Sequence, residues 1–299
     1  MRAGSGVLES RPVVGVSAMM LNTLLIPLMG VAIKKLTEMD VSTVEMLAYR
    51  SLLVVAVLTP FLISPANRRA IRKADRRAHL VHAVFGISSM ACFYYALRTL
   101  PLATVTSINF TTPIFALFFA WLLYGDRPGW RSMAATVLGF AGTLIVLRPG
   151  ADGLSPDMLV VVLGSILAAA MNLSVRRMPP QSSNFAVIYY FGAAGAVVFA
   201  ALYALDARLL SLDTSPWILL LGAIAVGIHV FVALAYRFAS SMMVGALDYF
   251  RLFWALILGL WLFGEWPDGR DAAGMALIVG SGLYILYRET RSLRPAVAR

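Results

Sequence analysis

The sequence predicts an all-α membrane protein with ten transmembrane helices, arranged as two five-helix repeats of inverted topology. Three observations support this prediction: 60% of the 299 residues are hydrophobic, only 13% are charged, and apolar runs of membrane-spanning length recur along the whole chain. An ordinary soluble domain has about 25% charged residues, and a helix that spans a bilayer needs about 20 apolar residues. The composition therefore excludes a soluble globule and a disordered chain.

Ten segments have the length and apolarity of a spanning helix, and the connections between them are too short to hold a soluble domain. The predicted spans are residues 13–33, 43–63, 79–97, 102–124, 130–148, 157–175, 184–204, 216–236, 242–263 and 271–288. We therefore divide the chain into a first five-helix repeat, residues 1–150, and a second, residues 151–299, which ends in a cytoplasmic tail.

The distribution of Lys and Arg sets the expected orientation, because cytoplasmic loops carry an excess of these residues. When both termini are placed in the cytoplasm, most of the basic residues lie inside, including the run in residues 68–77. The outer loops then hold most of the acids, among them Glu38, Asp40 and Asp213. The net charge of +10 is thus explained by topology, and it predicts no nucleic-acid partner.

The two halves of the chain resemble each other. Residues 96–131 align with residues 235–270 without a gap, at a constant offset of 139, and the offset pairs Asp126 with Glu265. Because each half has five spans, an odd number, the second half starts on the opposite side of the membrane from the first. Inverted repeats of this kind are typical of secondary transporters, whose substrate site lies between the halves near the bilayer midplane.

Both copies begin with an Ala-x-Arg triplet and end in a glycine followed by an acid. The matching residues are Ala96-Leu97-Arg98, Pro113 and Gly125-Asp126 in the first copy, and Ala235-Tyr236-Arg237 and Gly264-Glu265 in the second. This pattern resembles the drug/metabolite transporter superfamily, and within it the EamA type. The resemblance implies a multi-pass carrier of small metabolites in a bacterial inner membrane, often an exporter, without implying one substrate. The second copy departs from the pattern, since Leu252 stands where Pro113 would align.

Ionisable side chains inside a span are costly and face a cavity or a partner. Arg50 lies in the second predicted span, and its bidentate, permanently charged fork suits a substrate carboxylate or phosphate. The alternative is that Arg50 holds helices together. Asp248 and Arg251, three residues apart on one helix face, are either functional groups of the site or a neutralising pair that holds helices together. His229 is either a packing residue or a proton-coupling group, because its charge changes near neutral pH.

Two prolines inside spans predict helix breaks. Pro27 and Pro113 cannot donate to the carbonyls of Thr23 and Asn109, and both freed carbonyls lie among polar side chains. Broken helices with polar walls are tolerated where the backbone lines a cavity. The alternative is a kink that local Thr and Asn hydrogen bonds stabilise.

These residues predict a central cavity between the halves. The candidate substrate-binding residues are Arg50, Asn109, His229, Tyr249 and Arg251, with Asp248 and His229 as candidate coupling groups and Pro27 and Pro113 as helix breaks. One cysteine and three histidines predict no metal site. We expect no cofactor, and the sequence has no G-x-x-x-x-G-K-[ST] loop for ATP.

The first functional interpretation is a secondary transporter that exports small organic metabolites, such as amino acids or amphipathic compounds. This interpretation rests on the arginines and aromatic residues that we expect in one cavity. The alternative is an importer of a heterocyclic metabolite or a vitamin resembling riboflavin. A membrane-embedded enzyme is a remote alternative, because the spans lack clustered acids, histidines or a nucleophile dyad. The expected partners are a small-molecule substrate and the lipid bilayer, and the sequence predicts neither the coupling ion nor an oligomeric state.

Overall fold

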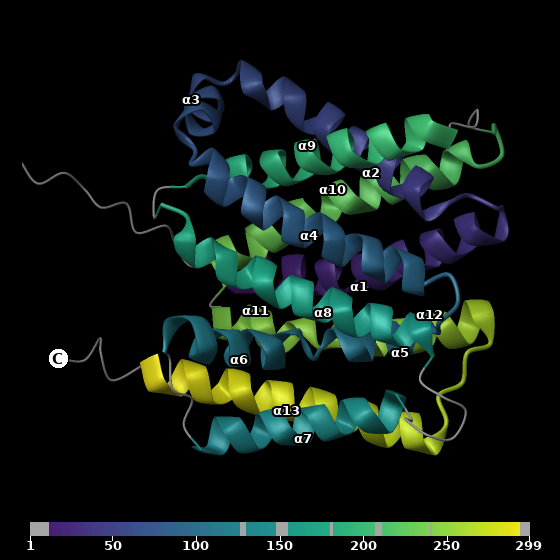
Figure 1. The fold of residues 1–299 in the computed structure, drawn as a ribbon, viewed down its shortest axis with the longest axis vertical. Helices are drawn as coiled ribbons and strands as arrows, with labels where there is room; N and C mark the ends of the chain where they lie inside the picture. Colours follow the sequence, from purple (N-terminus) through teal and green to yellow (C-terminus); the bar gives the residue numbers. More distant parts are fainter. Residues whose placement is uncertain are drawn as a thin grey trace, which may run out of the picture.

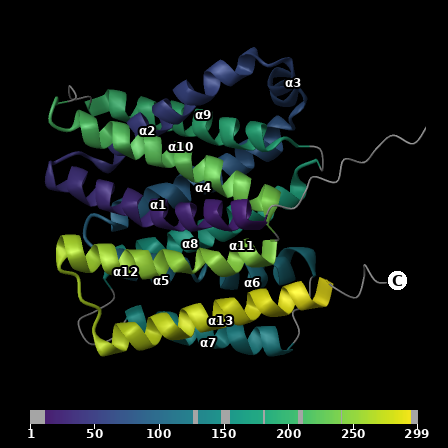
Figure 2. The ribbon, with the colours of Figure 1, turned by 180° about the vertical axis from the view of Figure 1, so that it is seen from behind.

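The computed structural model describes residues 12–125, 130–147, 155–179, 182–206, 211–239 and 241–293, and all regular elements in these ranges are helical. Most of the helices lie side by side and run between the same two end faces of the bundle (Figures 1 and 2). The α-helices are α1 (Pro12–Glu38), α2 (Thr43–Leu58), α3 (Pro65–Lys73), α4 (Arg76–Ala96), α5 (Leu102–Asn109), α6 (Thr112–Tyr124), α7 (Trp130–Leu147), α8 (Pro156–Ser174), α9 (Asn184–Tyr203), α10 (Ser215–Phe238), α11 (Ser241–Asp248), α12 (Phe250–Phe263) and α13 (Gly269–Leu293). Short 3₁₀ turns are η1 (Thr59–Ile63), η2 (Val175–Arg177) and η3 (Ala204–Asp206).

Seven helical stretches in the described residues are long and apolar enough to cross a membrane, so the protein is a multi-pass membrane protein. They are Val13–Glu38, Thr43–Ile63, Leu102–Tyr124, Pro156–Arg177, Asn184–Tyr203, Ser215–Phe238 and Met243–Phe263, and a shorter apolar helix covers Met133–Val146. The remaining predicted spans correspond to α4 and α13. These helices are more polar, since α4 buries His79 and His82, and α13 begins with the charged residues Arg270 and Asp271.

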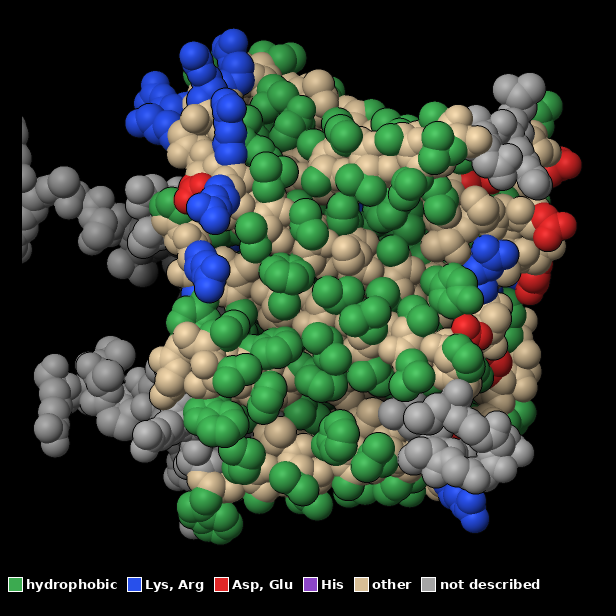
Figure 3. All heavy atoms as spheres, in the orientation of Figure 1, with side chains coloured by type: hydrophobic (Ala, Val, Ile, Leu, Met, Phe, Trp, Pro, Cys, Tyr) green, Lys and Arg blue, Asp and Glu red, His purple; other side chains and the backbone are tan. Residues whose placement is uncertain are grey.

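Lys and Arg gather at one end face, whereas most Asp and Glu lie at the opposite end, together with a few Lys and Arg (Figure 3). We call the end that holds α3 the basic face; its basic residues include Arg68, Arg69, Arg72, Lys73, Arg176, Arg177 and Arg237. We call the opposite end the acidic face; its acidic residues include Glu38, Asp40, Asp157, Asp213 and Asp268. Helix α1 begins and α13 ends at the basic face (Figure 1). Hydrophobic side chains cover much of the surface between the faces, as expected for contact with the hydrocarbon of a bilayer.

The main helix contacts join one half of the chain to the other. The most extensive contacts are those of α1 with α10, α4 with α8, α2 with α9, and α7 with α13, and α5 also contacts α12. The set of contacts is symmetric: if each of the first five predicted spans is exchanged with its counterpart among the last five, the same helix pairs are obtained. The buried core follows the same pairs, because its largest cluster combines residues of α1, α2 and α4 with Phe199, Ile218 and Leu221.

Two helical passages are discontinuous at positions that the offset of 139 relates. Helix α5 ends at Asn109 and α6 begins at Thr112, next to Pro113. Helix α11 ends at Asp248 and α12 begins at Phe250, although no proline stands there. Both passages also end in the same way. Their C-caps are Gly125 and Gly264, at φ of 70° and 65°, which is the left-handed conformation that favours glycine.

The structure corrects the prediction of a helix break at Pro27, because α1 continues through this residue. The polar residues nearby have other partners: Asn22 Nδ2 donates to the carbonyl of Ile228 at 2.9 Å, and Thr23 Oγ1 donates to the carbonyl of Met20 at 2.8 Å. Helix α1 packs along α10 and α12. Such packing between neighbouring helices keeps a proline-containing helix intact within a membrane.

Candidate functional site

A cavity of about 490 Å³ lies where the two discontinuous passages meet α8 and α13. This volume is within the range of about 300–1,000 Å³ that is usual for small-molecule sites. Its polar and aromatic lining residues are Asn109, Phe110, Thr112, Asn172, Arg176, Asp248, Tyr249 and Arg251. Its apolar wall includes Pro113, Ala116, Leu117 and Ala120 of α6. Because α6 and α8 end at the basic face and α11 begins there, the cavity lies in the half of the bundle nearer that face (Figure 1).

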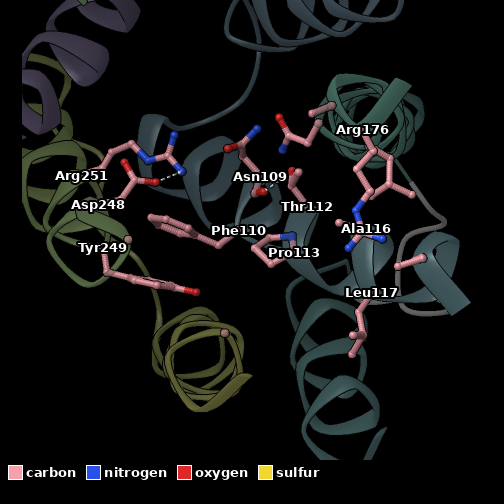
Figure 4. Close-up of a pocket in the computed structure, with 16 residues that line it drawn as sticks. Asn109, Phe110, Thr112, Pro113, Ala116, Leu117, Arg176, Asp248, Tyr249 and Arg251 are labelled. Carbon is pink, nitrogen blue, oxygen red and sulfur yellow. Dashed lines mark hydrogen bonds and ion pairs between the residues drawn. The ribbon is translucent and has the colours of Figure 1, made fainter. Parts of the chain in front are cut away.

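A layered stack of side chains forms one side of the cavity (Figure 4). The rings of Phe110 and Tyr249 stack with centroids 4.6 Å apart and an interplanar angle of 17°. The guanidinium of Arg251 lies over the other face of this pair, 4.5 Å from the Phe110 centroid. Phe110 and Tyr249 are equivalent under the repeat offset, so the stack forms where the two halves of the chain meet.

The stack is held by an ion pair at the second break. Arg251 Nη2 lies 3.0 Å from Asp248 Oδ2, and the two side chains are 17% and 32% exposed. The ion pair neutralises the charge of Arg251 within the cavity, because its partner is one turn away on the same passage. Arg251 Nε is buried without a hydrogen-bond partner among the described residues.

The first break contributes neutral polar groups. Thr112 Oγ1 donates to the carbonyl of Asn109 at 2.7 Å, which satisfies the acceptor that Pro113 cannot. The carboxamide of Asn109 is directed toward the cavity, and Asn172 of α8 lines the same cavity (Figure 4). Each carboxamide can both donate and accept hydrogen bonds. The cavity therefore offers amide groups beside an aromatic stack, and its Asp248–Arg251 pair is already joined.

The five predicted substrate-binding residues fall into two groups. Asn109, Tyr249 and Arg251 line the cavity, as do Asp248 and Pro113. Arg50 and His229 are not part of this lining.

The second group, Arg50 and His229, lies among α2, α4 and α10. Arg50 is only 5% exposed, and its Nε has no hydrogen-bond partner among the described residues. Its charge acts on the ring of His229 and on the hydroxyl of Tyr94. The Nε2 atom of His229 is likewise buried and without a partner in the described parts of the chain, and its ring contacts Phe191 edge-on at 6.2 Å.

Two lining residues, Asn172 and Arg176, were not predicted. Asn172 is a polar residue within an apolar span, a signal that could have marked it. The sequence indicates for Arg176 only a charged residue in a loop. In the structure, its guanidinium carbon lies 5.2 Å from the centroid of the Tyr124 ring. No group of three or more His, Cys, Asp or Glu side chains that could hold a metal ion occurs in the described ranges.

Comparison with known proteins agrees with the fold. The EamA-like transporter family matches residues 13–148. An S-adenosylmethionine uptake transporter of Rickettsia bellii is 25% identical over 240 residues, which are 79% of this chain and 81% of that protein. A riboflavin transporter of Brucella anthropi is 24% identical over 256 residues, which are 84% of this chain and 90% of that protein.

These matches support membership of the drug/metabolite transporter superfamily. A crystal structure aligns with 95% of this chain and 99% of its own chain, with a TM-score of 0.62 at 18% identity, which establishes likeness of fold. The family and these relatives are transporters, which argues against the membrane-enzyme alternative.

Proposed function

We propose that this member of the superfamily is a secondary carrier of small, flat heterocyclic metabolites. The observation that carries the proposal is the composition of the cavity: two carboxamides, Asn109 and Asn172, opposite an aromatic stack. Amide groups can pair with the polar edges of a heterocycle, and its faces can contact the apolar wall and aromatic side chains.

The charge arrangement favours this substrate class over free amino acids, which were the first prediction from the sequence. A zwitterionic amino acid needs a cation and an anion that are both available to it. Here Asp248 and Arg251 are bonded to each other at 3.0 Å. The names of the two relatives, for S-adenosylmethionine and riboflavin, also support a substrate that contains a flat ring system.

We further propose uptake as the physiological direction, since one relative is named as an uptake transporter. Export, the first prediction, is the competing direction. A carrier moves its substrate down whichever gradient it is coupled to, so the direction is tested in cells. Accumulation of an added heterocycle in cells that overproduce the protein supports uptake, and its loss to the medium supports export.

The proposed carrier has ten spans in two inverted repeats and lies in a bacterial inner membrane. The exchange of helix contacts between halves supports the repeat, as do the two breaks and the two left-handed glycine caps at the same offset. The positive-inside rule places the basic face and both termini in the cytoplasm. A reporter fused after Arg299 that proved to be outside the cell would contradict this orientation.

Arg50 and His229 form the second part of the proposal, a contact for an anionic group of the substrate. An unpaired charge inside a bilayer costs at least about 2.5–3.5 kcal/mol on insertion scales. Arg50 is buried with no carboxylate partner in the described chain. A carboxylate or phosphate on the substrate would supply the missing partner, since the arginine fork binds either group bidentately.

The direct test of the substrate class is flux through the purified protein in liposomes. We would load vesicles separately with a flavin, a purine nucleoside and a neutral amino acid, and measure counterflow of each labelled compound. The proposal expects counterflow of one or both heterocycles and none of the amino acid. Counterflow of the amino acid alone would reject the proposed substrate class. Chemical turnover without flux would support the enzyme alternative.

A further inference from the structure

The glutamate that follows α12 joins three helices from both halves of the chain. Glu265 Oε1 lies 2.6 Å from Lys34 Nζ of α1, and both side chains are largely shielded, at 13% and 12% exposure. Glu265 Oε2 accepts the backbone N–H of Leu102, the first residue of α5, at 2.9 Å. Helices α1 and α5 belong to the first half, whereas Glu265 belongs to the second.

The local backbone holds this carboxylate in place. The left-handed Gly264 ends α12, and the N–H of Glu265 then donates to the carbonyl of Gly259 at 3.1 Å. A Cβ atom at Gly259 would lie 2.8 Å from Glu265 Oε2, so the glycine leaves the space that the carboxylate occupies. A carboxylate at the start of α5 also interacts favourably with the helix dipole.

An apolar layer lies next to the ion pair. Val31, Leu102 and Ala255 form a buried cluster, against which Leu97, Leu258 and Phe263 pack. The ammonium of Lys34 lies 5.2 Å from the centroid of the Phe263 ring. These groups pack between α1, α5 and α12, whereas the cavity lies in the half of the bundle nearer the basic face.

We propose that Lys34, Glu265 and the N–H of Leu102 form a gate, the acidic-face latch, which must open for the cavity to reach the acidic face. The latch rests on the proposed carrier function, because alternating access requires the two halves to move around a fixed site. The latch connects those halves, so a rocking motion separates its partners. An exposed ion pair would contribute little to the stability of the closed state. This ion pair is shielded, and its carboxylate also accepts a hydrogen bond at the N-terminus of α5.

The test is the access of an impermeant maleimide to the cavity. The parent protein carries Cys92→Ser and Ala116→Cys, so that the single thiol lines the cavity. A second thiol protein, Cys92→Ser with Leu212→Cys, identifies the side of each vesicle that exposes the acidic face, since Leu212 is 88% exposed beside Asp213. Glu265→Gln should raise the modification of Ala116→Cys from that side about tenfold, within the range usual for coupling between conformations.

Lys34→Met is the second latch variant, because it keeps an apolar stem over Phe263 but removes the charge. It should produce the same increase, and it decides the test if Glu265→Gln is not stably inserted. Lys35→Gln is the matched control: Lys35 lies 5.4 Å from the Phe263 centroid, yet it pairs with exposed Glu38 and does not contact the latch. Equal modification in the parent, Lys34→Met and Lys35→Gln would overturn the proposal.

The experiment needs no substrate, so its failure differs from failure of the proposed function. Latch-dependent access without any heterocycle flux would sustain the latch and reject the substrate class. Heterocycle flux with no effect of Lys34→Met or Glu265→Gln on access would reject the latch and leave the substrate class standing.

Discussion

The two helix breaks are equivalent in the repeat, but different chemistry stabilises each. At the first break, hydroxyl groups donate to the last carbonyls of α5: Thr112 Oγ1 to that of Asn109 at 2.7 Å, and Thr111 Oγ1 to that of Ile108 at 2.6 Å. At the second break, an ion pair joins Asp248 to Arg251. The helix therefore ends at the same register with or without proline, because neighbouring side chains stabilise the break in both cases.

This difference also divides the cavity between the halves. The first break contributes neutral amide and hydroxyl groups, and the second contributes a charged pair and the tyrosine of the stack. An exact twofold repeat would place two identical sets of groups around one substrate. The divergence of the second copy gives an asymmetric cavity, which suits an asymmetric metabolite.

Removing the ring of Phe110 should have the largest effect, because this residue connects the two breaks. Phe110 is 2% exposed and contacts both Tyr249 and Arg251. Phe110→Ala should lower the free energy of unfolding by about 3 kcal/mol, as is usual for a buried phenylalanine. Thermal unfolding in detergent measures the loss. Phe110→Leu, the control, keeps much of the apolar volume and should lose clearly less, and no loss at all in Phe110→Leu would show that the aromatic stack contributes nothing.

Breaking the ion pair at the second break should have the next largest effect. Arg251→Gln leaves Asp248 with an unpaired charge in a partly shielded site, so we expect a loss of about 2 kcal/mol, below the 3–5 kcal/mol of a fully buried pair. Transport should fall as well. The double variant Asp248→Asn with Arg251→Gln should recover stability, because no charge is left unpaired. A double variant less stable than Arg251→Gln would contradict the assigned pairing.

Arg50 sharpens the comparison, because it is a buried arginine without the internal partner that Arg251 has. Arg50→Lys keeps the charge but loses the bidentate fork. We expect normal insertion and a fall in transport of about tenfold, the equivalent of 1.4 kcal/mol in binding the substrate anion. Flux in liposomes and the amount of folded protein are both measured.

Two outcomes for Arg50 would change the account. If Arg50→Lys and Arg50→Gln both transport at the wild-type rate, Arg50 does not bind substrate. If neither variant accumulates in the membrane, Arg50 holds helices together, which was the alternative reading of its sequence position.

Exchanging the residues that differ between the breaks should have the smallest effect. Pro113→Leu gives the first break the residue of the second, and Leu252→Pro does the reverse within the first turn of α12, where proline is tolerated. Each should change the free energy of unfolding by less than about 1 kcal/mol. Thermal unfolding and flux measure both variants. A loss of fold in Pro113→Leu would show that proline itself, rather than the Thr111 and Thr112 hydrogen bonds, determines the first break.

The sequence predicted those features that depend on local chemistry or on the repeat. The offset of 139 relates Phe110 to Tyr249 whatever the packing, and a proline at residue 113 marks a break because it has no N–H to donate. The second break has no such local mark, and the structure shows it where α11 ends at Asp248 and α12 begins at Phe250. The break predicted at Pro27 was wrong because contacts with α10 and α12 keep α1 continuous.

The separation of Arg50 from Arg251 could not have been predicted either. Both are arginines inside spans, and the sequence gives no distance between the second and ninth spans. Their grouping depends on the contacts of α2 with α9 and α10, and of α12 with α1 and α5. The same limitation hid Arg176, whose position beside the cavity depends on how α8 packs against α6.

The central claim is that substrate binds at the junction of the two breaks. The most direct measurement is protection of an introduced thiol by the transported heterocycle, in a Cys92→Ser background. Ala116→Cys lines the cavity, and the control Ala276→Cys lines a separate groove between α7 and α13. The account predicts that saturating heterocycle slows maleimide modification of Ala116→Cys and leaves Ala276→Cys unchanged. Protection of Ala276→Cys alone would place the substrate outside the cavity and contradict the account.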